Sequence, residues 1–138
     1  MTKEKSIAVL PFANMSNDPD QEYFSDGMAE EIINGLVKFP AVKVIARTSS
    51  FQFKGENRDI REIGKRLNVS HVLEGSIRTA GKRIRVTAQL ILVSDGMHLW
   101  SNRYDRELAD VFVVQDEITA EILKALHGHL ATTEEQPA

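Results

Sequence analysis

The stretch Arg83-Ile-Arg-Val-Thr-Ala-Gln-Leu-Ile-Leu-Val93 decides the fold. Apolar and polar side chains alternate along it, which is typical of a β-strand with one buried face and one solvated face. The apolar face would hold Ile84, Val86, Ala88, Leu90 and Leu92. The other face would hold Arg83, Arg85, Thr87 and Gln89. Turn sequences at 80–82 and 94–96 flank the stretch, so it predicts the middle strand of an antiparallel meander.

The two outer strands of that meander follow from the same turns. Residues 70–79 alternate loosely before Ala80-Gly-Lys82. After Ser94-Asp-Gly96 comes His98-Leu-Trp-Ser-Asn-Arg-Tyr-Asp-Arg106. The period of two predicts that Leu99 and Trp100 point to opposite faces of this last strand.

The first half of the chain reads as strand, helix and strand. The apolar run Ser6–Phe12 predicts a buried strand that Pro11 stops. A helix would begin at the capping pair Ser25-Asp26 and run to about Phe39, because Pro40 ends it. Residues 42–46 predict the second strand.

The remaining segments complete the expected topology. Residues 47–55 read as a polar loop, and Asp59 would cap a helix that runs to about Leu67. A final helix would start near Asp110 and run to about Leu130, with an apolar residue every fourth position. The sequence therefore predicts an α/β fold, a mixed β-sheet of about five strands packed by three helices. We expect one domain over 5–130 and a disordered tail over 131–138.

Composition excludes several classes of site. The 138 residues carry a net charge of −3 and contain no Cys. Without Cys there are no disulfides or thiolate metal ligands, and without a basic field we expect no direct binding of nucleic acid or membrane. Lys82, Arg83 and Arg85 form only a small basic stripe. No apolar run approaches the roughly 20 residues that span a bilayer. Cytoplasmic localisation is therefore expected, with an upstream membrane segment in the parent protein left open.

No catalytic arrangement stands out. Glu30-Glu31 and Asp116-Glu117 are helix neighbours that point about 100° apart. His127 and His129 are two residues apart, whereas helical metal pairs prefer a spacing of four. Ser49-Ser50 has no base nearby in sequence, and no phosphate-binding glycine motif is present. We expect no catalytic residue, no metal, no cofactor and no enzyme activity for this domain.

Two groups of residues are candidates for recognition. Arg47, Thr48 and Ser49 follow a strand and offer a guanidinium and hydroxyls that could hold an anion. The alternative is an ordered loop whose hydroxyls satisfy its own backbone.

The second group is the polar-aromatic strand 98–106. It carries Trp100, Arg103, Tyr104 and Arg106, which are residue types enriched at interface hot spots. Two structural alternatives stay open. Trp100 can pack under a helix, or Glu74 and Arg78 can form cross-strand ion pairs with charges of this strand.

Several motifs carry a family resemblance: Ser6-Ile-Ala-Val-Leu-Pro-Phe12, Glu22-Tyr-Phe-Ser-Asp-Gly27, Ala46-Arg-Thr-Ser-Ser-Phe51, Phe53-Lys-Gly55, Val72-Leu-Glu-Gly-Ser76, Trp100-Ser-Asn-Arg-Tyr-Asp-Arg106 and Val114-Gln-Asp-Glu-Ile118. In this order, over residues 5–130, the chain resembles the TolB amino-terminal-like domain of bacterial multidomain proteins. The resemblance implies an accessory or regulatory module beside an adenylate/guanylate cyclase catalytic domain, a winged-helix domain or tetratricopeptide repeats. The parent protein would then be a cyclase in some cases, although nothing in this chain resembles the catalytic domain.

These observations lead to one expected function and one alternative. We expect a non-catalytic regulatory or protein-interaction module of a bacterial signalling protein. It would bind a protein partner or adjacent domains of its own chain, and sheet-edge pairing would allow a homo-oligomer. The alternative is a sensor of an anionic small molecule or nucleotide, held by the Arg47 loop.

Overall fold

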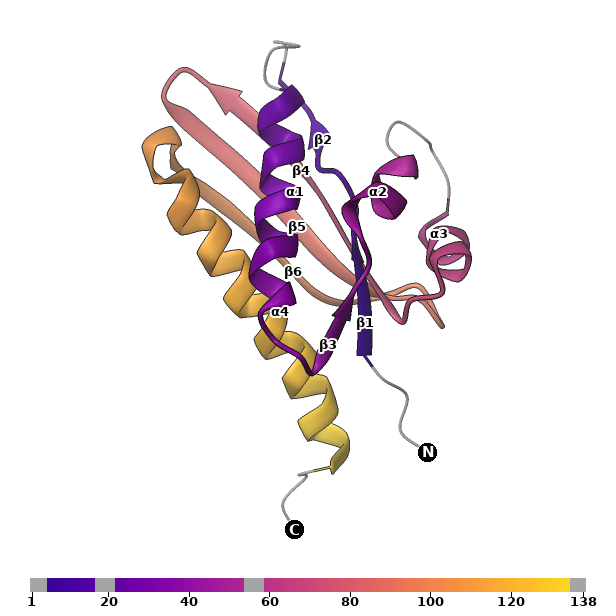
Figure 1. Ribbon diagram of the computed structural model, residues 1–138. Helices are drawn as coiled ribbons and strands as arrows, with labels where there is room; N and C mark the ends of the chain where they lie inside the picture. Colours follow the sequence, from indigo (N-terminus) through magenta and orange to yellow (C-terminus); the bar gives the residue numbers. More distant parts are fainter. Residues whose placement is uncertain (1–4, 17–21, 54–58, 135–138) are drawn as a thin grey trace.

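The computed structural model describes residues 5–16, 22–53 and 59–134. Its centre is a mixed six-stranded sheet in the order β3-β1-β4-β5-β6, with β2 paired to β4 (Figure 1). Strand β1 is parallel to β3 and β4, and β4, β5 and β6 form an antiparallel meander. The strands are β1 Lys5–Val9, β2 Ala13–Asn14, β3 Val42–Val44, β4 His71–Ala80, β5 Arg83–Leu92 and β6 Met97–Glu107. The prediction of a mixed α/β sheet is confirmed, with the short strand β2 added.

Helices α1 (Glu22–Val37) and α4 (Val111–Glu134) lie side by side on one face of the sheet (Figure 1). The predicted four-residue spacing of α4 buries Val114, Ile118, Ile122 and Leu126 completely or nearly so. The fifth predicted member, Leu130, lies outside the residues whose side chains the structure describes. Helix α4 packs with α1 against Ile84, Val86, Ala88 and Leu90 of β5, whereas Leu92 is half-buried and lies outside this core cluster. The core of this layer includes Ile7, Val9, Met28, Ile32, Leu36, Leu73, Ile84, Val86, Ala88, Leu90, Val114, Ile118, Ile122 and Leu126.

The described residues cover the opposite face of the sheet only in part. Helix α3 (Ile60–Leu67) packs there on β1 and the start of β4, over a second core cluster that includes Ala8, Ile63 and Val72. As predicted, Asp59 caps α3, because its Oδ1 accepts a 2.8 Å hydrogen bond from the Arg61 amide. The rest of this face, called the open face below, carries polar residues of β4, β5 and β6: Glu74, Ser76, Arg78, Arg83, Arg85, Thr87, Gln89, Ser101, Arg103, Asp105 and Glu107.

Helix α1 begins earlier than its predicted cap. It starts at Glu22, so Ser25 and Asp26 lie inside the helix rather than at its end. Ser25 is fully buried. It shares a helix face with Met28 and Ile32, three and seven residues further on, and that face points toward the sheet. The small hydroxyl residue therefore occupies a core position, and the capping prediction is wrong.

The predicted loop over 47–55 is helical where it is described. Arg47–Ser50 forms the short helix α2 and Phe51–Phe53 the 3₁₀ turn η2. The amides of Ser49 and Ser50 donate to the Ala46 carbonyl at 3.1 and 3.2 Å, which closes the first turn. A single turn of this kind leaves no hydrophobic periodicity in the sequence, so the pattern could not reveal it.

A bulge in β6 overturns the prediction that Leu99 and Trp100 face opposite ways. Leu90 pairs with Trp100, and Ile91 pairs with His98, which leaves Leu99 as an extra residue. The bulge resets the alternation, so both side chains pack against the core cluster beneath α4.

Helix α4 begins at Val111, close to the predicted start, and continues to Glu134. Residues 131–134 of the expected tail are therefore helical, since the first proline after Val111 is Pro137. Residues 135–138 lie outside the described part of the chain.

Candidate functional site

The seven residues predicted to bind fall into three places. Trp100, Tyr104 and Arg106 share the face of β6 that lies under α4, because they alternate along one strand. Arg103 is exposed on the open face. Arg47, Thr48 and Ser49 are on α2. The structure therefore does not gather them into one site, and whether they bind a partner stays a prediction.

Polar contacts join β6 to α4 on the covered face, a set called the α4 seam here. The Trp100 indole Nε1 donates to Glu121 Oε1 at 3.3 Å, and Asn102 Nδ2 donates to the same oxygen at 3.1 Å. Arg106 pairs with Glu117 at 3.1 Å. Trp100 thus packs under a helix, the structural alternative that the sequence left open. Asn102 was not among the predicted binding residues. Its alternation with Trp100 and Tyr104 along the strand could have placed it on the same face.

Tyr104 is the most buried aromatic residue of the α4 seam. Only 2% of its surface is exposed, and its hydroxyl makes no hydrogen bond to the described residues. Burial, reinforced by the nearby Glu121 carboxylate, raises the pKa of Tyr104 well above its ordinary value of 10.0. A side chain so enclosed stabilises the fold and cannot reach an external partner.

Arg47 is occupied by its neighbours. Its Nε lies 3.2 Å from Glu30 Oε2 on α1, and its guanidinium stacks 4.5 Å from the centre of the Phe51 ring. Thr48 is exposed and Ser49 is half-buried. Since Glu30 already neutralises the guanidinium, these contacts hold α2 against α1, and the geometry does not favour a free anion at this place.

Arginines of the open face gather around a hollow at the β4–β5 end of the sheet. Arg78, Arg83 and Arg85 line it together with Asp105, Ala80 and Ile84, and its volume is about 490 Å³. The Nε of Arg85 donates to Asp105 Oδ1 at 2.7 Å, and Arg103 lies 3.4 Å from Asp105 Oδ2. The hydrogen bond from Arg85 lowers the pKa of Asp105.

This arrangement corrects the expected cross-strand ion pairs. Glu74 and Arg78 are on β4, whereas strand β6 is two places away with β5 between them. Among the described residues of this face, the Arg85–Asp105 pair joins β5 to β6, and the Arg103–Asp105 pair lies within β6.

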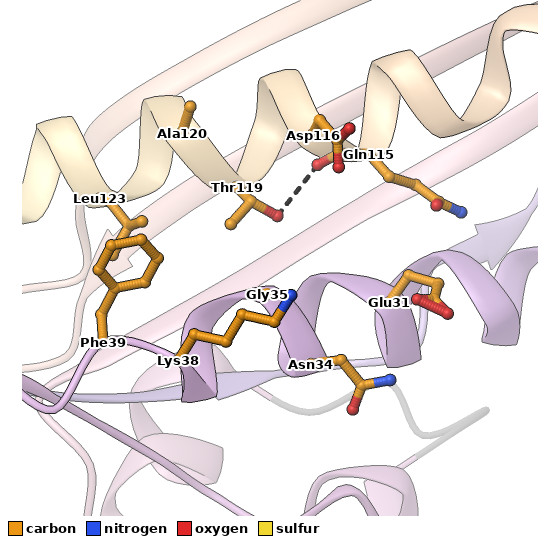
Figure 2. Close-up of a pocket in the computed structure, with 10 residues that line it drawn as sticks. All are labelled: Glu31, Asn34, Gly35, Lys38, Phe39, Gln115, Asp116, Thr119, Ala120 and Leu123. Atoms are coloured by element: carbon orange, nitrogen blue, oxygen red, sulfur yellow. Dashed lines mark hydrogen bonds between the residues drawn. The ribbon is translucent and has the colours of Figure 1, made fainter.

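A furrow of about 320 Å³ lies between α1 and α4, on the side away from the sheet (Figure 2). The helices approach closely at Gly35, where an added Cβ would lie 2.9 Å from Thr119 Cγ2. The Thr119 hydroxyl donates to the Gln115 carbonyl at 3.0 Å, so it is satisfied within α4. Phe39 and Leu123 form one apolar end of the furrow. Its polar lining comes from Glu31, Asn34, Lys38, Gln115 and Asp116.

The described residues offer little for catalysis. A hydroxyl–imidazole pair exists where Ser70 Oγ lies 2.7 Å from His71 Nδ1. That hydroxyl donates to the Ser6 carbonyl at 2.9 Å, and His71 is 2% exposed, so the pair ties β4 to β1. In residues 5–16, 22–53 and 59–134, His, Asp and Glu nowhere cluster in threes to hold a metal. Within the same ranges, no helix is both long and apolar enough to cross a membrane.

Comparison with known proteins decides the family. A family model described as the second domain of HilA/YgeH-like transcriptional regulators matches residues 3–124. The chain belongs to this family. As a HilA/YgeH-like second domain, it is a regulatory-type domain.

One curated relative is closely similar to this chain in sequence. The HilA/YgeH-like domain is 54% identical over 131 residues to "Putative adenylate cyclase 3" of Rhizobium meliloti (strain 1021). The match covers 95% of this chain and 22% of that relative, so the chain spans about a fifth of the relative's length.

Solved structures confirm that the fold is TolB-like. TolB from Acinetobacter baumannii superposes with a TM-score of 0.65 at 16% identity, over 92% of this chain and 29% of that one. Lipoprotein GNA1162 from Neisseria meningitidis has a TM-score of 0.61 at 18% identity, over 86% and 96% of the two chains. The LpoB C-terminal domain from Salmonella enterica has a TM-score of 0.60 at 16% identity, over 78% and 85%. At these identities the likeness establishes a shared fold.

Proposed function

We propose that this HilA/YgeH-like domain is a non-catalytic regulatory module that acts by protein contact. Its partner would be another domain of the same polypeptide. The family description as part of a transcriptional regulator supports the regulatory role. The 54% identity to a protein named as an adenylate cyclase supports a cyclase as the parent, with most of that relative lying outside the match. The cytoplasm, where bacterial ATP and DNA are found, is the location that fits both kinds of parent.

The furrow between α1 and α4 is the observation that carries this proposal. Protein interfaces typically combine a small apolar centre with a polar rim. Phe39 and Leu123 offer the apolar part, and Glu31, Lys38 and Asp116 offer charges beside it (Figure 2). Phe39 is 46% exposed, although aromatic residues are usually more buried. A neighbouring domain that covers Phe39 would remove this apolar surface from water.

The test compares two exposed phenylalanines. Phe39→Ala removes an aromatic ring from the furrow, whereas Phe112→Ala removes one that is 70% exposed on α4 and does not line it. We expect Phe39→Ala to change cyclic AMP formation by the full-length parent about fivefold, since a contact worth about 1 kcal/mol shifts an equilibrium by that factor. The melting temperature of both variants should stay close to that of the wild type.

Two results would contradict the proposal. One is unchanged output with Phe39→Ala in a parent that does form cyclic AMP. The other is an equal change with Phe112→Ala, which would show that exposed apolar surface in general, and not the furrow, matters.

A homo-oligomer is the second kind of partner that the fold permits. Within the described residues the edge strands of the sheet are β2, β3 and β6, and β6 is the longest of them with 11 residues. Sheet extension through β6 would require its outer backbone groups to pair with a second copy. Sedimentation equilibrium of the chain would detect such a dimer.

A further inference from the structure

Two like charges face each other on the open face. Arg78 on β4 and Arg85 on β5 are direct partners in the antiparallel ladder. Both side chains are exposed, and Arg83 lies two residues before Arg85 on the same face. Like charges at directly opposed positions destabilise a sheet. Nearby groups of opposite charge would be needed to offset the repulsion between these two guanidiniums.

The neighbouring carboxylates neutralise only part of this charge. Arg85 and Arg103 share Asp105, which lies 2.7 and 3.4 Å from their Nε atoms. Within the described part of the chain, Arg78 and Arg83 make no ion pair and no side-chain hydrogen bond. Glu107 is opposite Arg83 in the ladder, yet no ion pair joins them there. Arg78 and Arg83 thus have no direct ion-pair partner among the described residues, although the charge of Arg83 helps to lower the pKa of Asp105. They lie beside a third guanidinium, that of Arg85, which Asp105 holds in place.

These arginines line a hollow large enough for a small ligand. The volume of about 490 Å³ falls in the range of small-molecule sites. The β4–β5 turn is at the opposite end of the sheet from the start of β1 and the end of α4 (Figure 1). The hollow is also on the other face of the sheet from the α1–α4 furrow. A ligand here would therefore not compete with the proposed domain contact.

We propose that Arg78, Arg83 and Arg85 bind the pyrophosphate group of a small anionic ligand. A guanidinium offers a planar pair of N–H donors that matches two oxygens of one phosphate. A pyrophosphate carries several negative charges on adjacent phosphates, which suits uncommitted guanidiniums on neighbouring strands. Asp105 acts as a positioning residue, because its bond to Arg85 orients that guanidinium across the hollow.

Isothermal titration calorimetry with inorganic pyrophosphate tests the site. The wild-type chain should bind with a saturable, one-to-one isotherm that weakens as sodium chloride rises. The double variant Arg78→Gln, Arg83→Gln should bind at least about tenfold more weakly, since each charge-assisted hydrogen bond contributes on the order of a tenfold change in affinity. The double variant Lys65→Gln, Arg66→Gln removes the same charge from exposed positions of α3 and should bind like the wild type.

Three results would overturn the assignment. They are no heat of binding at millimolar pyrophosphate, equal weakening in both double variants, and citrate binding as tightly as pyrophosphate. The last would mean that the arginines recognise carboxylates rather than phosphates. Because the site does not include the furrow, failure to bind pyrophosphate would not contradict the proposed domain contact.

Discussion

The two faces of strand β6 use similar residues for different purposes. On the covered face, Trp100 and Arg106 bond to carboxylates of α4, and Tyr104 is buried between them. On the open face, Ser101 and Arg103 are exposed. Both faces carry an arginine beside a carboxylate, yet one joins two elements of the fold and the other borders an arginine-lined hollow. The comparison teaches that the residues of a polar-aromatic strand must first be assigned to its two alternating faces. Only then can any of them be assigned to recognition.

The largest expected contrast is in stability, between two positions of β6 that lie on opposite faces of the sheet. Tyr104→Ala should lower the free energy of unfolding by about 3–5 kcal/mol, because it removes a fully packed aromatic ring. Ser101→Ala, on the open face, should change it by no more than about 0.5 kcal/mol. Urea denaturation followed by circular dichroism measures both values. Similar losses at the two positions would show that the open face is covered in solution.

The dependence of stability on alkaline pH should provide a second test of the burial of Tyr104 on the covered face. The folded state raises the pKa of Tyr104, so below pH 10 the phenol is protonated in both folded and unfolded chains. Above pH 10 the unfolded chain loses that proton while the folded chain keeps it. The free energy of unfolding should therefore fall, by up to about 1.4 kcal/mol per pH unit.

Tyr104→Phe is the matched variant for this measurement. It keeps the ring and removes a hydroxyl that makes no hydrogen bond to described residues, so it should unfold no more easily than the wild type at pH 7. Its stability should fall less steeply between pH 10 and 11. An identical slope for the two proteins would contradict the burial of this phenol.

The smallest expected effect is a gain in stability on the open face. Arg78→Gln removes the repulsion between Arg78 and Arg85 and should raise the free energy of unfolding by about 0.2–0.5 kcal/mol. The gain should shrink at high salt, where exposed charges are screened. A loss of stability on this substitution would mean that Arg78 makes a favourable contact within the fold.

Much of the fold was accessible from the sequence because its signals are periodic. The alternation in β5, the four-residue spacing in α4 and the Asp59 cap each follow from local chemistry, and each is observed. The bulge at Leu99 was not accessible, since one unpaired residue leaves no mark in an alternating pattern that also contains Trp100. The predicted cap at Ser25 was wrong for a similar reason, because the sequence does not distinguish a buried serine from a capping serine.

The candidate sites were only partly accessible. Alternation places Trp100, Tyr104 and Arg106 on one face of β6, but which face α4 covers depends on the three-dimensional arrangement. The pairing of Arg78 with Arg85 could have been found from the β4–β5 turn. Gly81 adopts a φ of 58° there, and Ala80 pairs with Arg83 across the turn. Counting outward from that pair brings the two arginines opposite each other.

The central claim is that pyrophosphate binds on the open face of the sheet and not on the face that α4 covers. Its most direct test is a nuclear magnetic resonance titration with pyrophosphate. It would follow the Nε–Hε signals of the arginine side chains. We predict that the signals of Arg78, Arg83 and Arg85 shift saturably, while those of Arg47 and Arg106 stay in place. Shifts confined to Arg47 or Arg106, or no shift at millimolar pyrophosphate, would contradict the account.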